Sequence, residues 1–187
     1  MKKIIAAAVI LAAVLSGCSG GGSSAPADGG KGVAVSFDFL KKDGYSTNQI
    51  AVWVEDGDGN YVKTLYVTKF TAEGGWKVRE QALPLWVKNS DAENLSEDEL
   101  SAVSKATPAS GKVEVFWDLT DAAGNLVQGN SYVIKVEATV RAENAAVYTI
   151  STDISAGTTD ADIGCTYTGE AAEDRDMISN VTAEFKQ

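Results

Sequence analysis

The sequence predicts an all-β protein built as an antiparallel β-sandwich with one short inserted helix. Three observations predict this fold class. Apolar and polar residues alternate with a period of two at 113–118 and 132–139, as expected for strands with one buried face. Asp, Gly and Asn cluster at 56–60 and 121–125, where they favour tight turns. Finally, about seven short apolar segments bounded by turn residues recur along the chain, which is typical of sandwiches.

These strand candidates occupy most of the chain after residue 32, so residues 33–187 are predicted to form a single domain. Ser155–Asp176 is rich in Gly, Thr, Asp and Glu and is expected to be a long loop or an insertion. The expected strands are Val33–Leu40, Gln49–Glu55, Asn60–Val67, 113–118, 132–139, Ala145–Ile154 and a terminal strand within Met177–Gln187.

Two hairpins are expected, because Asp-Gly-Asp-Gly-Asn at 56–60 and Asp-Ala-Ala-Gly-Asn at 121–125 each lie between two strand candidates. The first turn also has the spacing of the initial calcium ligands of an EF-hand loop. However, Tyr61 stands where that loop needs Gly, and Val67 where it needs a bidentate Glu. A plain turn is therefore favoured, and no metal site is predicted.

The clearest helical signal lies within Asp91–Thr107. Ser96 is a good N-cap, and Glu99 three residues later completes a capping box. Acidic residues fill the first turn, where the helix dipole favours anions. Pro108 prevents the helix from continuing, so Thr107 is expected just past its end, on the turn into the next strand.

The N-terminus has the pattern of a secretory signal. Lys2 and Lys3 precede an apolar run that is too short to span a bilayer, and Leu-Ser-Gly follows immediately before Cys18. This ending resembles a bacterial lipobox. The resemblance implies a signal peptide at 1–17, lipid attachment at Cys18 and anchoring on an extracytoplasmic membrane surface. Residues 18–32, rich in Ser, Gly and Ala, are then expected to be a flexible tether.

Composition excludes several function classes. The formal net charge of −10 argues against a nucleic-acid partner, because phosphate binding needs clustered Lys and Arg. The chain has no histidine, so Ser-His-Asp and Cys-His catalysis and His-based metal sites are excluded. Beyond Cys18 the only cysteine is Cys165, which either pairs between chains or, as we favour, packs as a small buried residue.

Two tryptophans are candidates for ligand stacking. Trp76 and Trp86 flank Leu-Pro-Leu in a less regular segment. A single sandwich core that also holds Trp53 or Trp117 is crowded, so at least one of Trp76 and Trp86 is expected at the surface. Exposed aromatic rings stack on sugars, flavins and other planar ligands. The alternative is packing beneath a long loop.

Two families share motifs with this chain. Residues 117–138 contain Trp-Asp, Asp-x-x-Gly, Gly-x-x-Tyr and Val-Glu-Ala in order, which resembles the Ig-like repeat of flagellar hook-capping proteins and implies an Ig-like sandwich. The segments Gln49–Ala72, Gly75–Lys88 and Ala102–Gly111 resemble a family of predicted periplasmic proteins, domain of unknown function 2271. This second resemblance extends from about Val33 to the C-terminus.

A third resemblance concerns a cofactor. Ser104-Lys105-Ala106-Thr107 is similar to the Ser-Gly-Ala-Thr motif of exported flavoproteins, in which a separate FAD:protein FMN transferase attaches FMN to the Thr through a phosphoester. The chain departs from the motif in having Lys105 in place of Gly, and Ser101 where the motif usually has Asp. Lys105 can pair with a phosphate or obstruct the transferase. The alternative is that Ala-Thr-Pro simply ends a helix.

Two function classes remain. The first is a non-enzymatic, lipid-anchored binding or scaffold module beside an envelope redox system, with no cofactor; its sugar-binding variant uses Trp76 or Trp86. The absence of histidine, of a Gly-rich phosphate loop and of a paired-carboxylate site favours this class. The second is an electron carrier with covalent FMN on Thr107, which the motif at 104–107 implies.

Overall fold

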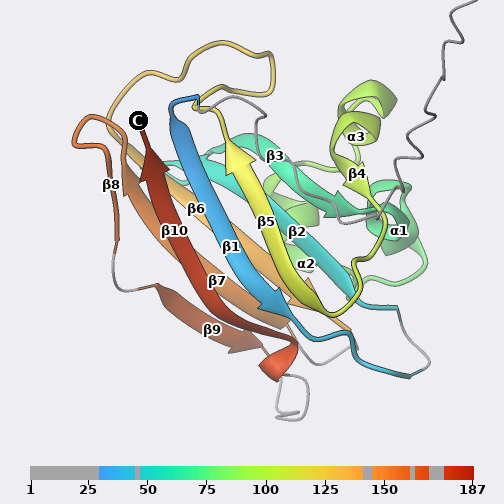
Figure 1. The fold of residues 1–187 in the computed structure, drawn as a ribbon. Coiled ribbons are helices and arrows are strands. Elements are labelled where there is room, and N and C mark those ends of the chain that lie inside the picture. Colours follow the sequence, from blue (N-terminus) through green and yellow to red (C-terminus); the bar gives the residue numbers. More distant parts are fainter. Residues whose placement is uncertain (1–29, 45–46, 141–144, 161–162, 169–174) are drawn as a thin grey trace, which may run out of the picture.

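Two stacked β-sheets form the body of the protein (Figure 1). The computed structural model describes residues 30–44, 47–140, 145–160, 163–168 and 175–187. A three-stranded sheet has the order β10-β1-β5, with β1 at Gly32–Phe39, β5 at Gly111–Trp117 and β10 at Ile178–Lys186. The prediction of an all-β sandwich is confirmed.

The second sheet has seven strands in the order β4-β3-β2-β6-β7-β8, with β9 also paired to β7. All its strand pairs are antiparallel except β3 and β4, which run parallel over two residues. The short strands β8 and β9 and a 3₁₀ turn, η2, fall within the segment expected to be a loop. The bounds are β2 Gln49–Asp56, β3 Tyr61–Thr68, β4 Ser104–Lys105, β6 Ser131–Thr139, β7 Ala145–Asp153, β8 Thr158–Thr159, β9 Gly164–Thr168 and η2 Arg175–Met177.

A hydrophobic core fills the space between the two sheets. Alternate residues of β1 and β5 point inward, as the period-two pattern predicts. They meet the inward residues of β2 and β6, so both sheets bury one face in the same core. The core residues of these four strands are Val33, Val35, Phe37, Phe39, Ile50, Val52, Val54, Val113, Val115, Trp117, Tyr132, Ile134, Val136 and Ala138.

The strands β5 and β6 do not form the hairpin that the sequence predicted. β5 pairs only with β1, whereas β6 pairs with β2 and β7 in the other sheet. The connection through 118–130 is long enough to cross the roughly 10 Å between packed sheets. Trp117 and Tyr132, at its two ends, therefore meet across the core with ring centroids 5.1 Å apart.

The two Asp-x-x-Gly-Asn turns nevertheless have the same geometry. Asp56 and Asp121 each donate their backbone N–H to the carbonyl of the Asn four residues later. The last glycine of each, Gly59 or Gly124, has a φ above +80° that side chains rarely adopt. The first turn joins β2 to β3 as a hairpin, as predicted. The Asp56 carboxylate accepts the N–H groups of Asp58 and Asn60, as in a plain turn.

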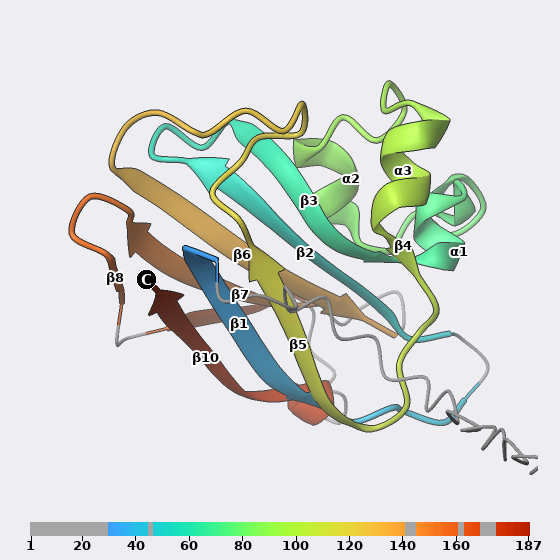
Figure 2. The same ribbon diagram turned by 45° about the horizontal axis from the view of Figure 1, so that its top comes forward.

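A helical insertion between β3 and β4 covers the other face of the seven-stranded sheet (Figure 2). The sequence predicted one helix here. α3 at Glu97–Val103 confirms it, with the full capping box between Ser96 and Glu99. Two further α-helices and a 3₁₀ turn precede it, and they are too short to show helical periodicity in the sequence. They are α1 Lys69–Ala72, η1 Gly75–Lys77 and α2 Pro84–Asn89.

A second core lies beneath this insertion. It joins Ala51, Trp53 and Val67 of the sheet to the buried Leu83 and Trp86 of the insertion. β2 is consequently buried on both faces, which explains why its sequence is nearly continuously apolar rather than alternating. The protein has three layers: the small sheet, the large sheet and the helices.

Replacing Trp117 with Ala should destabilise the protein by about 3–5 kcal/mol, because it removes a fully buried side chain and its contact with Tyr132. Denaturant unfolding followed by circular dichroism would measure this loss. Leu126→Ala, at an exposed position of the same connection, is the control and should change stability by less than about 0.5 kcal/mol. Equal losses of stability in the two variants would mean that the connection between the sheets does not depend on the contact of Trp117 with Tyr132.

Candidate functional site

A cleft of about 730 Å³ lies between α1–η1 and α3. Its apolar lining comes from the side chains of Ala72, Ala92, Leu95 and Leu100, which belong to or pack against the second core. Trp76 adds a half-buried indole ring. A volume of this size and a mixed polar and apolar lining are typical of small-molecule sites.

The rim of the cleft carries charges of both signs. Lys69 and Glu73 form an ion pair of 3.5 Å along α1, and the Lys77 ammonium lies 5.2 Å from the centre of the Trp76 ring. Glu93 and Glu97 approach from the opposite side. Two lysines against three glutamates leave the lining with an excess of one negative charge, so the cleft offers no net attraction to an anion.

The two tryptophans predicted as stacking candidates have different environments. Trp76 lines the cleft and keeps part of its surface exposed. Trp86 is fully buried, and its indole N–H donates to the Thr64 hydroxyl at 2.9 Å. The prediction of Trp86 as a stacking surface is therefore wrong. Trp86 belongs to α2, and its ring is buried between this helix and the sheet. Trp53 and Trp117 are also fully buried, so Trp76 is the one tryptophan in this chain with accessible surface.

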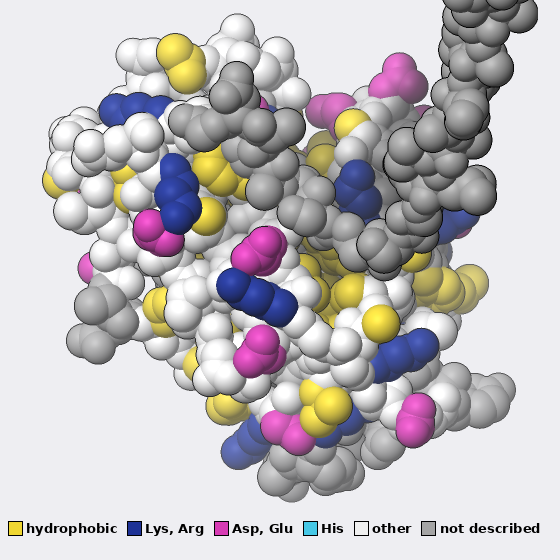
Figure 3. Space-filling view, viewed as in Figure 1, with side chains coloured by type: hydrophobic (Ala, Val, Ile, Leu, Met, Phe, Trp, Pro, Cys, Tyr) yellow, Lys and Arg dark blue, Asp and Glu magenta, His cyan; other side chains and the backbone are white. Residues whose placement is uncertain are grey.

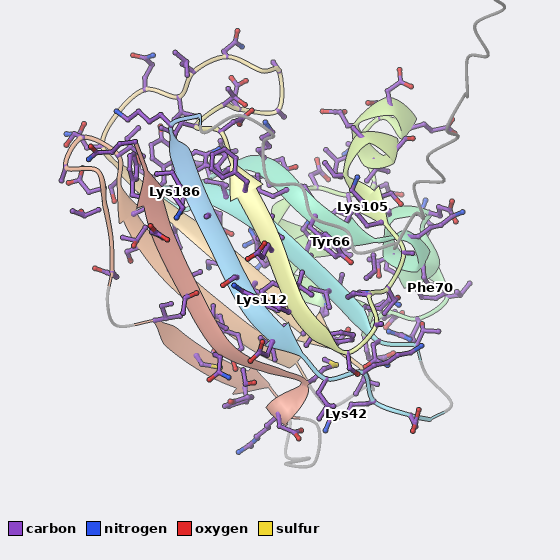
Figure 4. All side chains as sticks on the ribbon, viewed as in Figure 1. Lys42, Tyr66, Phe70, Lys105, Lys112 and Lys186 are labelled. Atoms are coloured by element: carbon purple, nitrogen blue, oxygen red, sulfur yellow. The ribbon has the colours of Figure 1, made fainter. Side chains whose placement is uncertain are left out.

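The segment 104–107 is not a simple turn after the predicted helix, because it begins with a short strand. α3 ends at Val103, and Ser104–Lys105 forms β4 against the end of β3. Ser104 lines the cleft, while Lys105 is exposed on β4 (Figure 4). The segment therefore meets the same cleft as Trp76, a proximity that the sequence did not indicate.

Thr107 does not line this cleft. Its half-buried hydroxyl donates to the carbonyl oxygen of Asn48 at 3.2 Å, and the neighbouring carbonyl of Ala106 accepts the Tyr66 hydroxyl at 3.1 Å. Both bonds fix the segment against the sheet. Attachment of a group to the Thr107 oxygen requires that its bond to Asn48 be broken first.

The position of the helical insertion depends on Glu137, a residue that the sequence did not single out. Glu137 lies on β6, fully buried, and its carboxylate accepts the backbone N–H groups of Leu85 at 3.1 Å and Trp86 at 2.8 Å. No side chain of α2 caps these N–H groups, and the residue before the helix, Leu83, has a φ of 57°. Glu137 thus acts as an N-cap supplied by the sheet.

The other end of α2 is held by a second buried carboxylate. Glu55 on β2 accepts hydrogen bonds from the Asn89 amide at 2.6 Å and the Trp53 indole at 2.7 Å. It also pairs with Lys135 of β6 at 3.2 Å. From α2 the chain runs on to Ala92, Glu93 and Leu95, which form one wall of the cleft. The two carboxylates therefore position that wall.

The remaining site predictions concern Cys165, metal ions and Cys18. Cys165 lies half-buried on β9 and forms no disulfide with any described residue. Within the described ranges, no group of three or more Cys, Asp or Glu side chains is placed to hold a metal ion. Cys18 and the predicted signal peptide lie outside the described residues.

Comparison with protein families identifies the chain. The model of a family described as predicted periplasmic protein, domain of unknown function 2271, matches residues 31–170. The chain belongs to this family. The matched part of this DUF2271 protein includes the helical insertion, the cleft and every strand except β10. The family description assigns a periplasmic location.

Comparisons of the DUF2271 protein with curated proteins and with solved structures find no match. No helix within the described residues is long and apolar enough to cross a membrane. The Ig-like topology and the similarity to hook-capping repeats stay predictions.

Stability should fall as the pH rises from about 4.5 to about 7, because burial raises the pKa of the Glu137 carboxyl from 4.5 to about 7. The folded state then binds more protons than the unfolded state across this window, and the loss amounts to roughly 3 kcal/mol. The substitution Glu137→Gln removes the titrating group. The variant should be less stable at pH 4.5 and should lose the slope between pH 4.5 and 7.

Denaturant unfolding at a series of pH values measures both effects. Glu114→Gln, at an exposed position on β5, is the matched control and should keep the slope of the natural sequence. A Glu137→Gln variant with an unchanged slope would show that another group controls this pH dependence.

Proposed function

We propose that this DUF2271 protein is a non-enzymatic binding module of the periplasm, anchored by lipid at Cys18 and acting beside an envelope redox system. The observation that carries the proposal is the cleft between α1–η1 and α3, with Trp76 on one wall and Ser104 at its edge. The cleft combines an aromatic ring with hydroxyl, carboxylate and ammonium groups. Such a mixture suits a ligand that presents both a flat apolar face and several hydroxyls.

The charge of the lining narrows the class of ligand. Glu73, Glu93 and Glu97 can each accept hydrogen bonds from hydroxyl groups, and their negative charge disfavours a phosphate or carboxylate ligand. Lys69 and Lys77 are engaged with Glu73 and Trp76 respectively. A neutral saccharide, which stacks one ring face on Trp76 and donates its hydroxyls to the glutamates, fits these groups best.

Binding without catalysis is favoured by the residues present. The chain contains no histidine to act as a general base near neutral pH. Among the described residues, the one carboxyl with a strongly raised pKa is that of Glu137, which is fully buried and does not line the cleft. The carboxyl best suited to act as a general acid near neutral pH therefore lies outside the cleft.

A second candidate function is a covalent FMN carrier. Ser104 of the motif-like segment lines a cleft of flavin size, and Lys105 is exposed beside it. Two features oppose this function. The Thr107 hydroxyl is half-buried and bonded to Asn48, and Thr107 does not line the cleft in which the flavin ring would have to lie. FMN attached here would supply one-electron and two-electron redox chemistry, while the protein would supply position and environment.

Titration of the protein with maltotriose, cellotriose and chitotriose should change its tryptophan fluorescence saturably for at least one of them. Trp76→Ala should weaken binding about tenfold by calorimetry, because stacking on the ring is lost. Leu126→Ala, an exposed substitution outside the cleft, should leave the affinity unchanged. A flat response to all three saccharides would overturn the saccharide assignment.

Intact-mass spectrometry after co-expression with an FAD:protein FMN transferase distinguishes the two functions. The binding module should have its unmodified mass, since Lys105 departs from the motif and Thr107 is bonded to Asn48. A mass raised by one FMN that Thr107→Val abolishes would instead establish the carrier. In that case Lys105→Gly should increase the modified fraction, and Ser110→Ala, a control in the same loop, should leave it unchanged.

A further inference from the structure

An apolar and basic surface lies on α1 and η1, beside the cleft. Val78 is 85% exposed and Phe70 is 37% exposed. Gly75 lets η1 pack directly on α1: a Cβ at this position would lie 2.4 Å from the Phe70 carbonyl oxygen. Val78 follows η1 directly and precedes Arg79, whose guanidinium lies over the Phe70 ring. Figure 4 shows Phe70 projecting away from the sheets. We call the surface formed by Lys69, Phe70, Trp76, Lys77, Val78 and Arg79 the α1–η1 patch.

Cations are interleaved with the aromatic rings of the α1–η1 patch. Lys77 lies over Trp76, and the Arg79 guanidinium lies 5.3 Å from the centre of the Phe70 ring. Figure 3 shows Lys and Arg side chains near exposed hydrophobic ones on this side of the molecule. Two glutamates are close in sequence: Glu73, which is paired with Lys69, and Glu80. The unpaired positive charge of the patch therefore comes from Lys77 and Arg79.

Only some of the hydrogen-bond donors of the Arg79 guanidinium have partners within the described structure. Its Nη1 group donates to the Thr47 carbonyl at 2.9 Å, whereas its Nε and Nη2 atoms are buried without a hydrogen-bond partner among the described residues. An unpartnered buried donor costs free energy. Nε and Nη2 form one of the edges through which a guanidinium binds carboxylate or phosphate in a bidentate manner. The guanidinium carbon lies over the Phe70 ring, so the ring helps to cover this group.

We propose that the α1–η1 patch docks the folded domain onto an anionic phospholipid surface. Val78, Phe70 and Trp76 enter the interface between headgroups and acyl chains, where valine and aromatic side chains are stable. Lys77 and Arg79 then lie at the level of the lipid phosphates. When the Phe70 ring moves into the interface, it uncovers the Nε–Nη2 edge of Arg79, which binds a phosphate.

The overall charge of the protein favours a basic face over the rest of its surface at an anionic membrane. The chain carries a net charge of −10, so most of its surface is repelled by anionic headgroups. About a dozen residues separate Cys18 from the first described residue, and they span at most about 40 Å when extended. A tether of this reach lets any face of a domain with a radius of gyration near 15 Å turn toward the membrane. The local chemistry of the α1–η1 patch then selects the orientation.

Vesicle flotation tests this docking without any lipid anchor. The chain from residue 18 onward, with Cys18→Ser, is mixed with vesicles of phosphatidylcholine alone or with one third phosphatidylglycerol. The protein should float with the anionic vesicles and much less with the neutral ones. Val78→Asp should reduce the bound-to-free ratio about tenfold or more, because a charged side chain replaces the apolar one that enters the membrane interface. Val78 is exposed, so the substitution leaves the packing intact.

Leu126→Asp is the matched control, an equally drastic change at a residue 71% exposed outside the patch, and it should float like the natural sequence. Brominated acyl chains should quench Trp76 in bound protein and not in the Val78→Asp variant. Equal flotation of both Asp variants, or bound protein with unquenched Trp76, would overturn the proposal. Val78 does not line the cleft, so saccharide binding should survive in Val78→Asp and is tested separately.

Discussion

The hydrogen bonds between the Glu137 carboxylate and the backbone of α2 are the interaction on which the outer layer depends. A six-residue helix is not stable alone, and this one begins without a local cap. The sheet supplies the missing acceptor at one end, and Glu55 binds Asn89 at the other. Burying a carboxylate is costly, so two N–H donors at a helix N-terminus are a suitable partner for it. Without this contact Trp86 and the wall of the cleft that follows it would be held by the bond of the indole to Thr64 and by Glu55 at the far end of α2.

Local sequence patterns were sufficient for the seven longer strands, the turns and α3, but they did not indicate the short strands β4, β8 and β9. The capping box at Ser96 and Glu99, and the Asp-x-x-Gly-Asn turns, involve contacts between residues at most four positions apart. Such contacts are visible in the sequence. Which strands pair is not visible in this way. Period-two alternation shows that β5 and β6 each have a buried face, but it does not distinguish neighbours in one sheet from strands that face each other across the core.

The candidate site was predictable only in parts. Trp76 and Ser104 were singled out separately, yet their shared cleft depends on how α1 and α3 pack on the sheet. Glu137 alternates with the inward residues of β6 and therefore resembles a solvent-facing position. It is buried because the helical insertion covers that face of the sheet. This packing is part of the tertiary structure, and no local pattern in the sequence indicates it. The same covering explains Trp86, whose burial followed from the second core and not from the sandwich core that the sequence predicted.

The three-stranded sheet joins strands from the beginning, the middle and the end of the described chain. β1 pairs with β5 on one edge and with β10 on the other, from Gly32 opposite Lys186 to Phe39 opposite Ile178. Pairing over such long separations requires closing large loops, which makes it slow. One edge of β1 consequently stays unpaired until β10 is available. The small sheet can therefore reach its full width only after this C-terminal segment has been added.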